Sequence, residues 1–180
     1  MSSNVIKDHS TTTSTAGSRV TAENVMPFAL PPLAHVGIVV ADLERAAADY
    51  ERRWGVATEP VVDLALDDAL LHGKQAATSA RYGFISTGAS QIELIQPLGA
   101  HSPYTEFLEA NDGDGVHHLA YVVDGIDRFL EHLRDAGETV DVGFTTSFTF
   151  PGLGSGRFTY IDGLMHGPAI ELIELAPVSS

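Results

Sequence analysis

One pattern occurs twice in the chain: HVGIVVADLERAAADYERRWG at residues 35–55 and HLAYVVDGIDRFLEHLRDAG at residues 118–137. Each copy opens with His, alternates small and large residues into Val-Val, and continues into an amphipathic segment that ends in Gly. The alternation predicts a buried strand. The amphipathic segment predicts a helix, because its acidic start, basic end and Gly are typical of helix termini. We therefore expect a strand and then a helix in each copy.

A second motif follows each predicted helix. QIELI at residues 91–95 matches AIELI at residues 169–173, and each is an apolar strand with Glu at its centre. Further strand-like runs cover residues 81–87, 145–150 and 157–161. Each half therefore consists of a strand, a helix and about three more strands, which predicts an α+β fold with an internal repeat.

The repeat also predicts the domain organisation. We expect a first module over residues 33–100, a linker with a short helix over residues 101–114, and a second module over residues 115–176. A Ser/Thr-rich N-terminal tail (1–32) and a short C-terminal tail (177–180) flank them. The N-terminal tail lacks the apolar core of a signal peptide, and no run approaches the roughly 18–20 apolar residues of a membrane span. We therefore expect a cytoplasmic protein.

The repeat puts two histidines and two glutamates in equivalent positions. His35 and His118 open the matching strands, and Glu93 and Glu171 lie at the centres of the matching IEL motifs. If a pseudo-twofold axis relates the halves, two imidazoles and two carboxylates meet on the concave strand faces. Such a set suits a divalent metal that keeps one or two positions for water or substrate. Because side chains alternate along a strand, we expect His117 to point to the opposite face.

Each of these residues has a simpler interpretation when it is taken alone. A His that opens a strand is commonly a hydrogen-bonded structural residue, and a Glu between apolar neighbours often faces water on an edge strand. Metal ligation is favoured because both pairs recur at matched places in two copies. The absence of Cys restricts such a site to nitrogen and oxygen ligands.

The composition narrows the classes of partner. The chain has 180 residues, with 24 acidic against 10 basic side chains, a formal net charge of −14 and no Cys. A strongly negative protein repels nucleic acid and anionic lipid, so we expect neither nucleic acid nor a membrane as a partner. Without Cys the chain forms no disulfides and offers no thiolate nucleophile. A small molecule is the expected partner.

A family resemblance rests on four segments of the chain. HVGIVVADLERAAADYERRWG, IELIQP, GVHHLAYVVDGIDRFLEHLRDAG and AIELIEL resemble the vicinal oxygen chelate superfamily, which includes glyoxalase I, extradiol dioxygenases and methylmalonyl-CoA epimerase. The resemblance covers residues 33–175 and implies two tandem βαβββ modules that form a curved, cup-shaped mixed sheet around a metal site. Metal ligands in that superfamily lie on the first and last strands of each module, which here implies His35, Glu93, His118 and Glu171.

Within the superfamily the chain looks most like the methylmalonyl-CoA epimerases. QPL at residues 96–98, SPY at residues 102–104, FL at residues 107–108 and GVHH at residues 115–118 are similar to their linker in order and spacing. Those epimerases carry an acidic base on a strand before the second ligand, whereas residues 73–87 here contain no carboxylate.

Few residues remain as candidates for a proton-transferring base. They are Glu93 and Glu171, His117 if the strand parity is locally broken, and His166 in a predicted turn. We favour Glu171 and keep Glu93 as the second catalytic candidate.

The resemblance implies a divalent-metal-dependent enzyme that stabilises the enolate of a chelated carbonyl substrate. An epimerase or isomerase acting on an acyl-CoA is the first interpretation. A glyoxalase I-like lyase and a metal-free protein that binds a small molecule, such as an antibiotic, are the alternatives. The expected cofactor is one divalent ion, with Co, Ni, Mn, Zn and Mg all compatible with the ligand types.

A small set of residues is expected to contact the substrate. Cationic side chains near the predicted pocket strands are few, whereas aromatic side chains are plentiful and can line a cup for an apolar ligand. The predicted substrate-binding residues are Gln91, Arg81, Phe148, Arg157 and Tyr160. By analogy with other members of the superfamily we also expect a homodimer.

Overall fold

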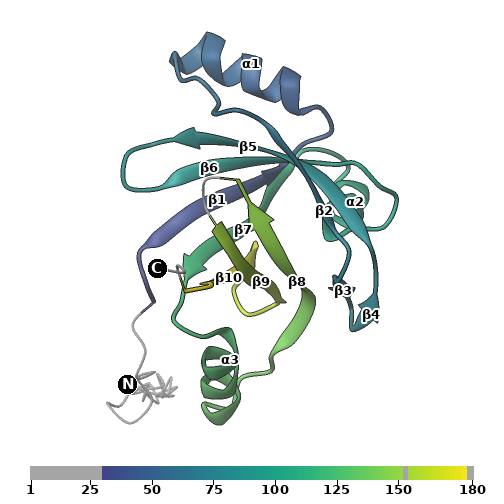
Figure 1. Cartoon of the computed structure of the whole chain (residues 1–180), viewed down its shortest axis with the longest axis vertical. Helices are drawn as coiled ribbons and strands as arrows, with labels where there is room; N and C mark the ends of the chain where they lie inside the picture. Colours follow the sequence, from purple (N-terminus) through teal and green to yellow (C-terminus); the bar gives the residue numbers. More distant parts are fainter. Residues whose placement is uncertain (1–29, 152–153, 178–180) are drawn as a thin grey trace, which may run out of the picture.

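A computed structural model describes residues 30–151 and 154–177. Within these residues ten strands form one continuous mixed sheet that curls into a cup, and three helices pack on it (Figure 1). The order along the chain is β1 (Leu33–Val39), α1 (Leu43–Trp54), β2 (Val62–Leu66), β3 (Leu70–Leu71), β4 (Lys74–Gln75), β5 (Thr78–Ser86), β6 (Gln91–Pro97), α2 (Pro103–Ala110), β7 (Gly115–Val122), α3 (Ile126–Asp135), β8 (Asp141–Phe150), β9 (Gly154–Asp162) and β10 (Ala169–Leu175). The predicted α+β cup is confirmed. The predicted N-terminal tail lies outside the described residues as far as residue 29, and so do residues 178–180 of the predicted C-terminal tail.

The two copies of the sequence pattern lie at the centre of the sheet. The strand order is β2-β5-β6-β1-β7-β10-β9-β8-β3-β4. β1 pairs with β7 in an antiparallel arrangement, while β6 runs parallel to β1 and β10 runs parallel to β7. The two opening strands of the repeat are therefore neighbours, and each is flanked by the IEL strand of its own half.

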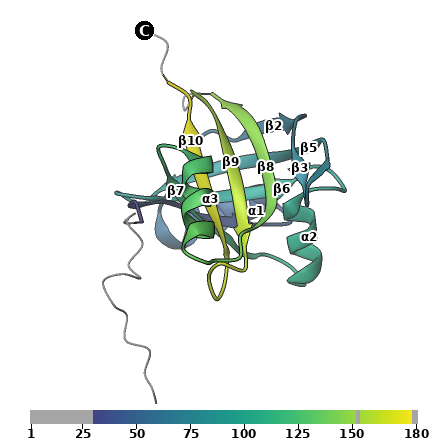
Figure 2. The same ribbon diagram turned by 90° about the horizontal axis from the view of Figure 1, so that it is seen from below.

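Alternation along the strands separates an inner face of the sheet from an outer one. Leu94 and Leu172, the residues that follow the two IEL glutamates, face outward and pack beneath α1 and α3, respectively. Figure 2 shows α3 lying across β9 and β10 on this outer side. The inner faces share one cluster rich in aromatic side chains, into which α2 inserts the fully buried Tyr104. Because α1 and α3 cover the outer face of the sheet, the inner face remains for the site.

Local sequence signals define the first long helix. The side chain of Asp42 accepts a hydrogen bond from the backbone N–H of Arg45 at 2.9 Å and so satisfies a donor that the helix start leaves unpaired. Gly55 ends α1 in the left-handed conformation with φ 67°, which costs a glycine little. The predicted boundaries of this helix agree with the structure.

A hairpin of the first half crosses to the second half. β3 and β4 pair with each other, and β3 also pairs with β8 through Leu70 beside Thr145 and Leu71 beside Phe144. The carboxylate of Asp68 accepts hydrogen bonds from Thr146 Oγ1 at 2.9 Å and from the backbone N–H of Ser147 at 3.3 Å. These contacts join the first half to the far edge of the second half, so the cup is held together at two places.

None of the helices in residues 30–151 and 154–177 combines the length and the apolar character that crossing a bilayer requires.

Candidate metal centre

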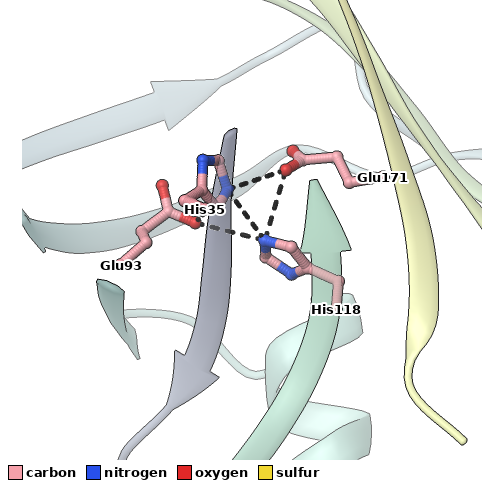
Figure 3. Close-up of side chains that lie close together, drawn as sticks. All are labelled: His35, Glu93, His118 and Glu171. Atoms are coloured by element: carbon pink, nitrogen blue, oxygen red, sulfur yellow. Dashed lines mark hydrogen bonds and ion pairs between the residues drawn. The ribbon is translucent and has the colours of Figure 1, made fainter. Parts of the chain in front are cut away.

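Four side chains meet on the inner face of the sheet (Figure 3). They are His35 on β1, Glu93 on β6, His118 on β7 and Glu171 on β10, and all four are buried. Their strands are four consecutive neighbours in the order β6-β1-β7-β10. The structure therefore brings together the four residues that the repeat singles out, two from each half.

The two halves place each His and Glu with the same register. Gly37, two residues after His35, pairs with Glu93, and Ala120, two residues after His118, pairs with Glu171. Equal register means that both His–Glu pairs project from equivalent points of the pleat. The antiparallel pairing of β1 with β7 then turns the two pairs toward each other.

The distances within this cluster are those of neighbouring ligands of one ion. His35 Nε2 lies 2.9 Å from Glu171 Oε2, 3.3 Å from Glu93 Oε2 and 3.1 Å from His118 Nε2. His118 Nε2 lies 3.2 Å from Glu171 Oε2 and 3.3 Å from Glu93 Oε2. Adjacent ligands lie about 3.0 Å apart around an octahedral ion with bonds of about 2.1 Å, and about 3.4 Å apart around tetrahedral zinc.

Two features of the cluster indicate room for a cation between these atoms. Glu171 Oε2 is buried and forms no well-aligned hydrogen bond with any described residue, although Nε2 of His35 is only 2.9 Å away and Nε2 of His118 is 3.2 Å away. The facing Nε2 atoms of His35 and His118 share at most one hydrogen bond. A divalent ion would satisfy all of these groups at once, because carboxylate oxygens and imidazole nitrogens are both good ligands for such ions. The donor set therefore fits a divalent metal.

Without a cation, the cluster is held together by charge. Burial lowers the pKa of His35, but the carboxylates of Glu93 and Glu171 outweigh burial and raise it to about 10. Burial likewise opposes the charged form of His118, yet Glu171 and Glu93 raise its pKa above the usual value. In the absence of metal the two carboxylates therefore favour the protonated form of both imidazoles, and His35 holds its proton at neutral pH.

The carboxylates respond in the opposite sense. Burial raises the pKa of Glu93, but the facing imidazole of His35 dominates and leaves it below the usual value. Burial of Glu171 is similarly outweighed by His118 and His35, so its pKa is also lowered. Both carboxylates are thus available as anionic ligands at neutral pH.

Gly37 is required at the floor of the site. A Cβ on residue 37 would overlap the imidazole ring of His118, because Gly37 and His118 are directly paired across β1 and β7. The equivalent position of the second half is Ala120, which lies beside His35. The internal symmetry is therefore incomplete, since only the first half needs a residue without a side chain.

The prediction that His117 points away from His118 is wrong. The pairing of β1 with β7 jumps from Gly37–His118 to Ile38–Val116, so β7 contains an extra residue at this point. Such a bulge breaks the alternation of side chains and turns both histidines to one side. His117 lies among the rings of Tyr104, Phe107 and Tyr160 at centroid distances of 5.5, 5.2 and 4.9 Å.

The bulge gives His118 a hydrogen-bond partner. Nδ1 of His117 and Nδ1 of His118 are 2.9 Å apart. If His118 binds a cation through Nε2, its proton is on Nδ1 and is donated to Nδ1 of His117, which must then be neutral and protonated on Nε2. Burial of His117, reinforced by the neighbouring His118, lowers its pKa to about 3 and so favours this neutral form.

A cavity of about 350 Å³ opens beside the cluster. Among the predicted substrate-binding residues, Gln91, Phe148 and Tyr160 line it, together with His35, Glu93 and Glu171 of the cluster. The rest of the lining is mostly apolar and aromatic, including Leu64, Phe84, Val122, Phe150 and Phe158. The cavity therefore suits the apolar body of a small molecule with polar groups at the cluster.

The two predicted cationic contacts are not in the cavity lining. Arg81 pairs with Glu44 at 2.6 Å and with Asp63 at 2.8 Å. Arg157 pairs with Asp127 at 2.7 Å and with Glu174 at 2.9 Å. Both guanidinium groups are held by carboxylates of neighbouring surface elements, which the linear sequence could not reveal.

The structure adds Glu59 and Tyr104 to the cavity residues, and it places there Tyr82, one of the aromatic residues that the sequence offers for a cup. Glu59 lines the cavity from the segment after α1, where its backbone N–H donates to the carbonyl of Phe84 at 2.7 Å. Tyr82 and Tyr104 also line it, and each is buried. Glu59 lies outside any repeated motif. In the sequence, Tyr104 stands out only as part of the linker that resembles the epimerases. The packing of α2 against the sheet brings its side chain to the cavity.

Comparison with known proteins finds relatives that are named as epimerases and that match more than half of the chain. An ethylmalonyl-CoA/methylmalonyl-CoA epimerase of Cereibacter sphaeroides is 38% identical over 108 residues, which are 60% of this chain and 72% of that protein. The mitochondrial methylmalonyl-CoA epimerase of Homo sapiens is 34% identical over 62% of this chain, and the match spans 60% of the human protein. The crystal structure of methylmalonyl-CoA epimerase from Mycobacterium tuberculosis superposes with a TM-score of 0.61 and 29% identity, over 87% of this chain and 97% of that one.

A family model extends this similarity beyond individual relatives. The model of the Glyoxalase/Bleomycin resistance protein/Dioxygenase superfamily matches residues 34–150. These residues include His35, Glu93 and His118 as well as most of the cavity wall. With its paired His–Glu strands and curled sheet, the chain belongs to the Glyoxalase/Bleomycin resistance protein/Dioxygenase superfamily, close to the methylmalonyl-CoA epimerases.

Proposed function

We propose that this protein is a divalent-metal-dependent enzyme of the epimerase or isomerase type, which moves a proton at a carbon next to a carbonyl group, with an acyl-CoA as the substrate class. The observation that carries the proposal is the convergence of four buried ligand-type atoms, two from each half, at the wall of an apolar cavity. The similarity to epimerases that are named for acyl-CoA substrates supports the substrate class.

His35, Glu93, His118 and Glu171 would hold the ion. When bound, a divalent cation would polarise a carbonyl oxygen of the substrate and stabilise the negative charge that develops as the neighbouring carbon loses its proton. Four protein ligands leave positions on an ion that prefers six, so substrate oxygens can be accommodated. The mostly apolar cavity wall would limit the access of water to the reacting carbon.

A carboxylate must accept the proton, and the cavity offers two kinds. Glu171 and Glu93 belong to the cluster, and we retain Glu171 as the favoured base. Glu59 is the cavity-lining carboxylate that lies outside the cluster, so it is free of the two imidazoles. This placement makes Glu59 a further candidate base beside Glu171 and Glu93, and residues 73–87 contain no carboxylate that would compete with it.

The cavity lining limits which part of an acyl-CoA can enter. Among the described residues the lining contains neither Lys nor Arg, while Glu59, Glu93 and Glu171 contribute negative charge. The phosphates of CoA would be repelled there, so we expect only the acyl group and the thioester to enter. A carbonyl compound without CoA, as a glyoxalase I-like lyase would use, fits the same lining and is the alternative.

The direct test is metal content together with hydrogen exchange. The purified protein loaded with Co²⁺ should contain about one ion per chain by elemental analysis, and it should exchange the α-hydrogen of at least one acyl-CoA in D₂O. His118→Ala should lose both the metal and the exchange, whereas His101→Ala, which removes an exposed imidazole outside the cavity lining, should keep both. Full metal content in His118→Ala would refute the ligand assignment.

The remaining outcomes separate the alternatives. Glu171→Gln should lower metal affinity, while Glu59→Gln should retain the metal and lose exchange only if Glu59 is the base. Bound metal without exchange of any acyl-CoA would contradict the epimerase proposal and favour a lyase. A protein that binds no divalent ion would favour a metal-free binding protein.

We also propose that the protein forms a homodimer, as expected by analogy. β2 and β4 are the two ends of the strand order and offer edges for pairing. Light scattering coupled to size-exclusion chromatography should give twice the 19.2 kDa chain mass, and a mass of one chain would contradict the proposal.

A further inference from the structure

Three tyrosine hydroxyls form a chain in the wall of the cavity. Tyr82 Oη lies 3.1 Å from Tyr104 Oη, and Tyr104 Oη lies 2.9 Å from Tyr160 Oη. The three residues come from β5, α2 and β9, so the chain joins the first half, the linker and the second half. All three line the cavity, and all three are buried, with exposed fractions of 4, 0 and 2%.

The chain of three hydroxyls has one more O–H donor than its internal hydrogen bonds use. Each phenol carries one O–H donor, and two hydrogen bonds within the chain use two of the three hydrogens. The three hydroxyls have no other hydrogen-bond partner among the described residues. The third hydrogen can lie on Tyr82, Tyr104 or Tyr160, depending on how the chain is oriented. Since an unsatisfied buried donor is costly, this hydrogen requires an acceptor in the cavity.

The environment keeps these phenols as donors. Burial raises the pKa of Tyr82 well above its usual value, and the carboxylates of Glu93 and Glu171 act in the same direction. The lining contains no Lys or Arg within the described part of the chain, so the phenols and the amide of Gln91 are its main neutral donors. Tyr160 also stacks on the ring of His118, at a centroid distance of 4.9 Å and an angle of 29°, which places the chain next to the metal ligands.

We propose that Tyr82, Tyr104 and Tyr160 form a specificity subsite, in which the hydrogen left over in the hydroxyl chain is donated to an oxygen of the substrate that the metal does not bind. The ligand class is therefore a small carbonyl compound with a second oxygen acceptor, such as a carboxylate, beyond the chelated group. This subsite deepens the proposed function, because the ligand is taken to be the substrate of the same metal centre. A hydroxyl chain can reorient, so it serves an acceptor at either end or at its middle.

The test compares dicarboxylates with a monocarboxylate. Oxalate, malonate and succinate present two carboxylates at increasing separation, whereas acetate presents one. Binding to the Co²⁺-loaded protein is measured by calorimetry and by the visible absorption of Co²⁺, and the best dicarboxylate is carried forward. We expect at least one of Tyr82→Phe, Tyr104→Phe and Tyr160→Phe to weaken dicarboxylate binding about tenfold, the loss expected for one hydrogen bond to a charged acceptor. Binding of acetate should be unchanged.

Tyr121→Phe is the matched control. Tyr121 is a buried tyrosine in the cluster under α3, outside the cavity lining, so its hydroxyl should not affect either ligand. Each variant keeps its aromatic ring, and thermal unfolding together with cobalt content checks that fold and site are intact. If all three cavity variants bind the dicarboxylate as Tyr121→Phe does, or weaken acetate to the same degree, the subsite is refuted.

The same titrations in the metal-free protein separate this proposal from the proposed function. If the protein holds no Co²⁺, the metal-dependent function fails, but the subsite still predicts weaker dicarboxylate binding in a tyrosine variant than in Tyr121→Phe. If the wild-type protein binds none of the three dicarboxylates with or without metal, the subsite is refuted whatever the metal content shows.

Discussion

The imidazole of His118 lies where a side chain on residue 37 would be, and this contact shows how much the site depends on a single glycine. Gly37 sits in regular strand β1, where glycine is otherwise unfavourable because it has no side chain to pack. Its value here is the space that it leaves for a ligand of the partner strand. At the residue scale, the proposed metal site therefore depends on the absence of a Cβ atom at residue 37.

Gly37→Ala is expected to lower the affinity for Co²⁺ about 100-fold, because the added methyl group displaces the ring of His118 from the other three ligands. The measurement is a Co²⁺ titration followed by visible absorption, with circular dichroism as the check on folding. Gly167→Ala is the control, since a Cβ at that position meets no atom within 4 Å. Equal affinities for the two variants would show that His118 is not a ligand.

The charges of the four cluster residues predict how metal affinity depends on pH. Glu93 and Glu171 raise the pKa of His35 to about 10, so metal must displace a proton from this imidazole at neutral pH. Below that pKa, affinity should rise about tenfold per pH unit for each proton displaced. Calorimetry of Co²⁺ binding between pH 6 and 8, in buffers of different ionisation enthalpy, measures both the affinity and the number of protons. Affinity that is independent of pH would contradict the proton-holding cluster.

The stability of the metal-free protein should change in the opposite direction. Because the pKa of His35 is raised in the folded state, its contribution to stability is complete below the unfolded value of 6.5 and is lost as the pH rises toward about 10. The lowered pKa of Glu93 contributes stability above 4.5 that is lost in acid. The metal-free cluster is therefore most stabilising between pH 4.5 and 6.5. Urea unfolding should show a free energy of unfolding that declines from pH 6 to pH 9.

At the scale of elements, the hairpin of β3 and β4 is the part that closes the cup. It belongs to the first half in sequence, but it pairs with β8 of the second half. Asp68, just before β3, anchors it through Thr146 and Ser147. These contacts lie far along the sheet from the metal ligands, so they contribute to the fold and not to the chemistry.

Asp68→Ala is expected to lower the free energy of unfolding by about 1–2 kcal/mol, because the Ser147 N–H loses its acceptor and the buried Thr146 loses the shorter of the two hydrogen bonds of its Oγ1. Metal affinity should be unchanged. Urea denaturation and a Co²⁺ titration measure the two quantities. Asp67→Ala is the control, since that neighbouring aspartate contributes only a backbone carbonyl to the hairpin, through Gln75 Nε2 at 3.0 Å. A similar loss of stability in both variants would argue against the anchoring role of the Asp68 carboxylate.

At the scale of the whole molecule, the repeat and the site are one feature. Each half supplies one His and one Glu from parallel neighbouring strands, and the antiparallel pair of β1 and β7 joins the halves. A metal ion bound between them would link the halves, since each half by itself offers only two ligands. The position of the cavity beside this junction gives both halves a part in the wall that surrounds a substrate.

Much of this arrangement could be predicted from the sequence because it repeats. The two copies of a His-led strand, an amphipathic helix and an IEL strand predict the α+β class and the positions of α1 and α3, and they single out His35, Glu93, His118 and Glu171. The bulge at His117 could not be predicted, since strand alternation assumes one residue per pleat position. The ion pairs of Arg81 and Arg157 also depend on which surface elements lie next to each other.

The sequence by itself determined which residue types recur and at which positions of each strand. Periodicity and helix termini act over a few residues, and a repeat transmits the same local pattern to both halves. Only the tertiary structure decided that β3 crosses to β8, that Tyr82, Tyr104 and Tyr160 meet in one hydroxyl chain, and that Gly37 makes room for His118. Each of these contacts joins residues that are far apart in the chain. They form only when the two halves pack together, which a local pattern does not specify.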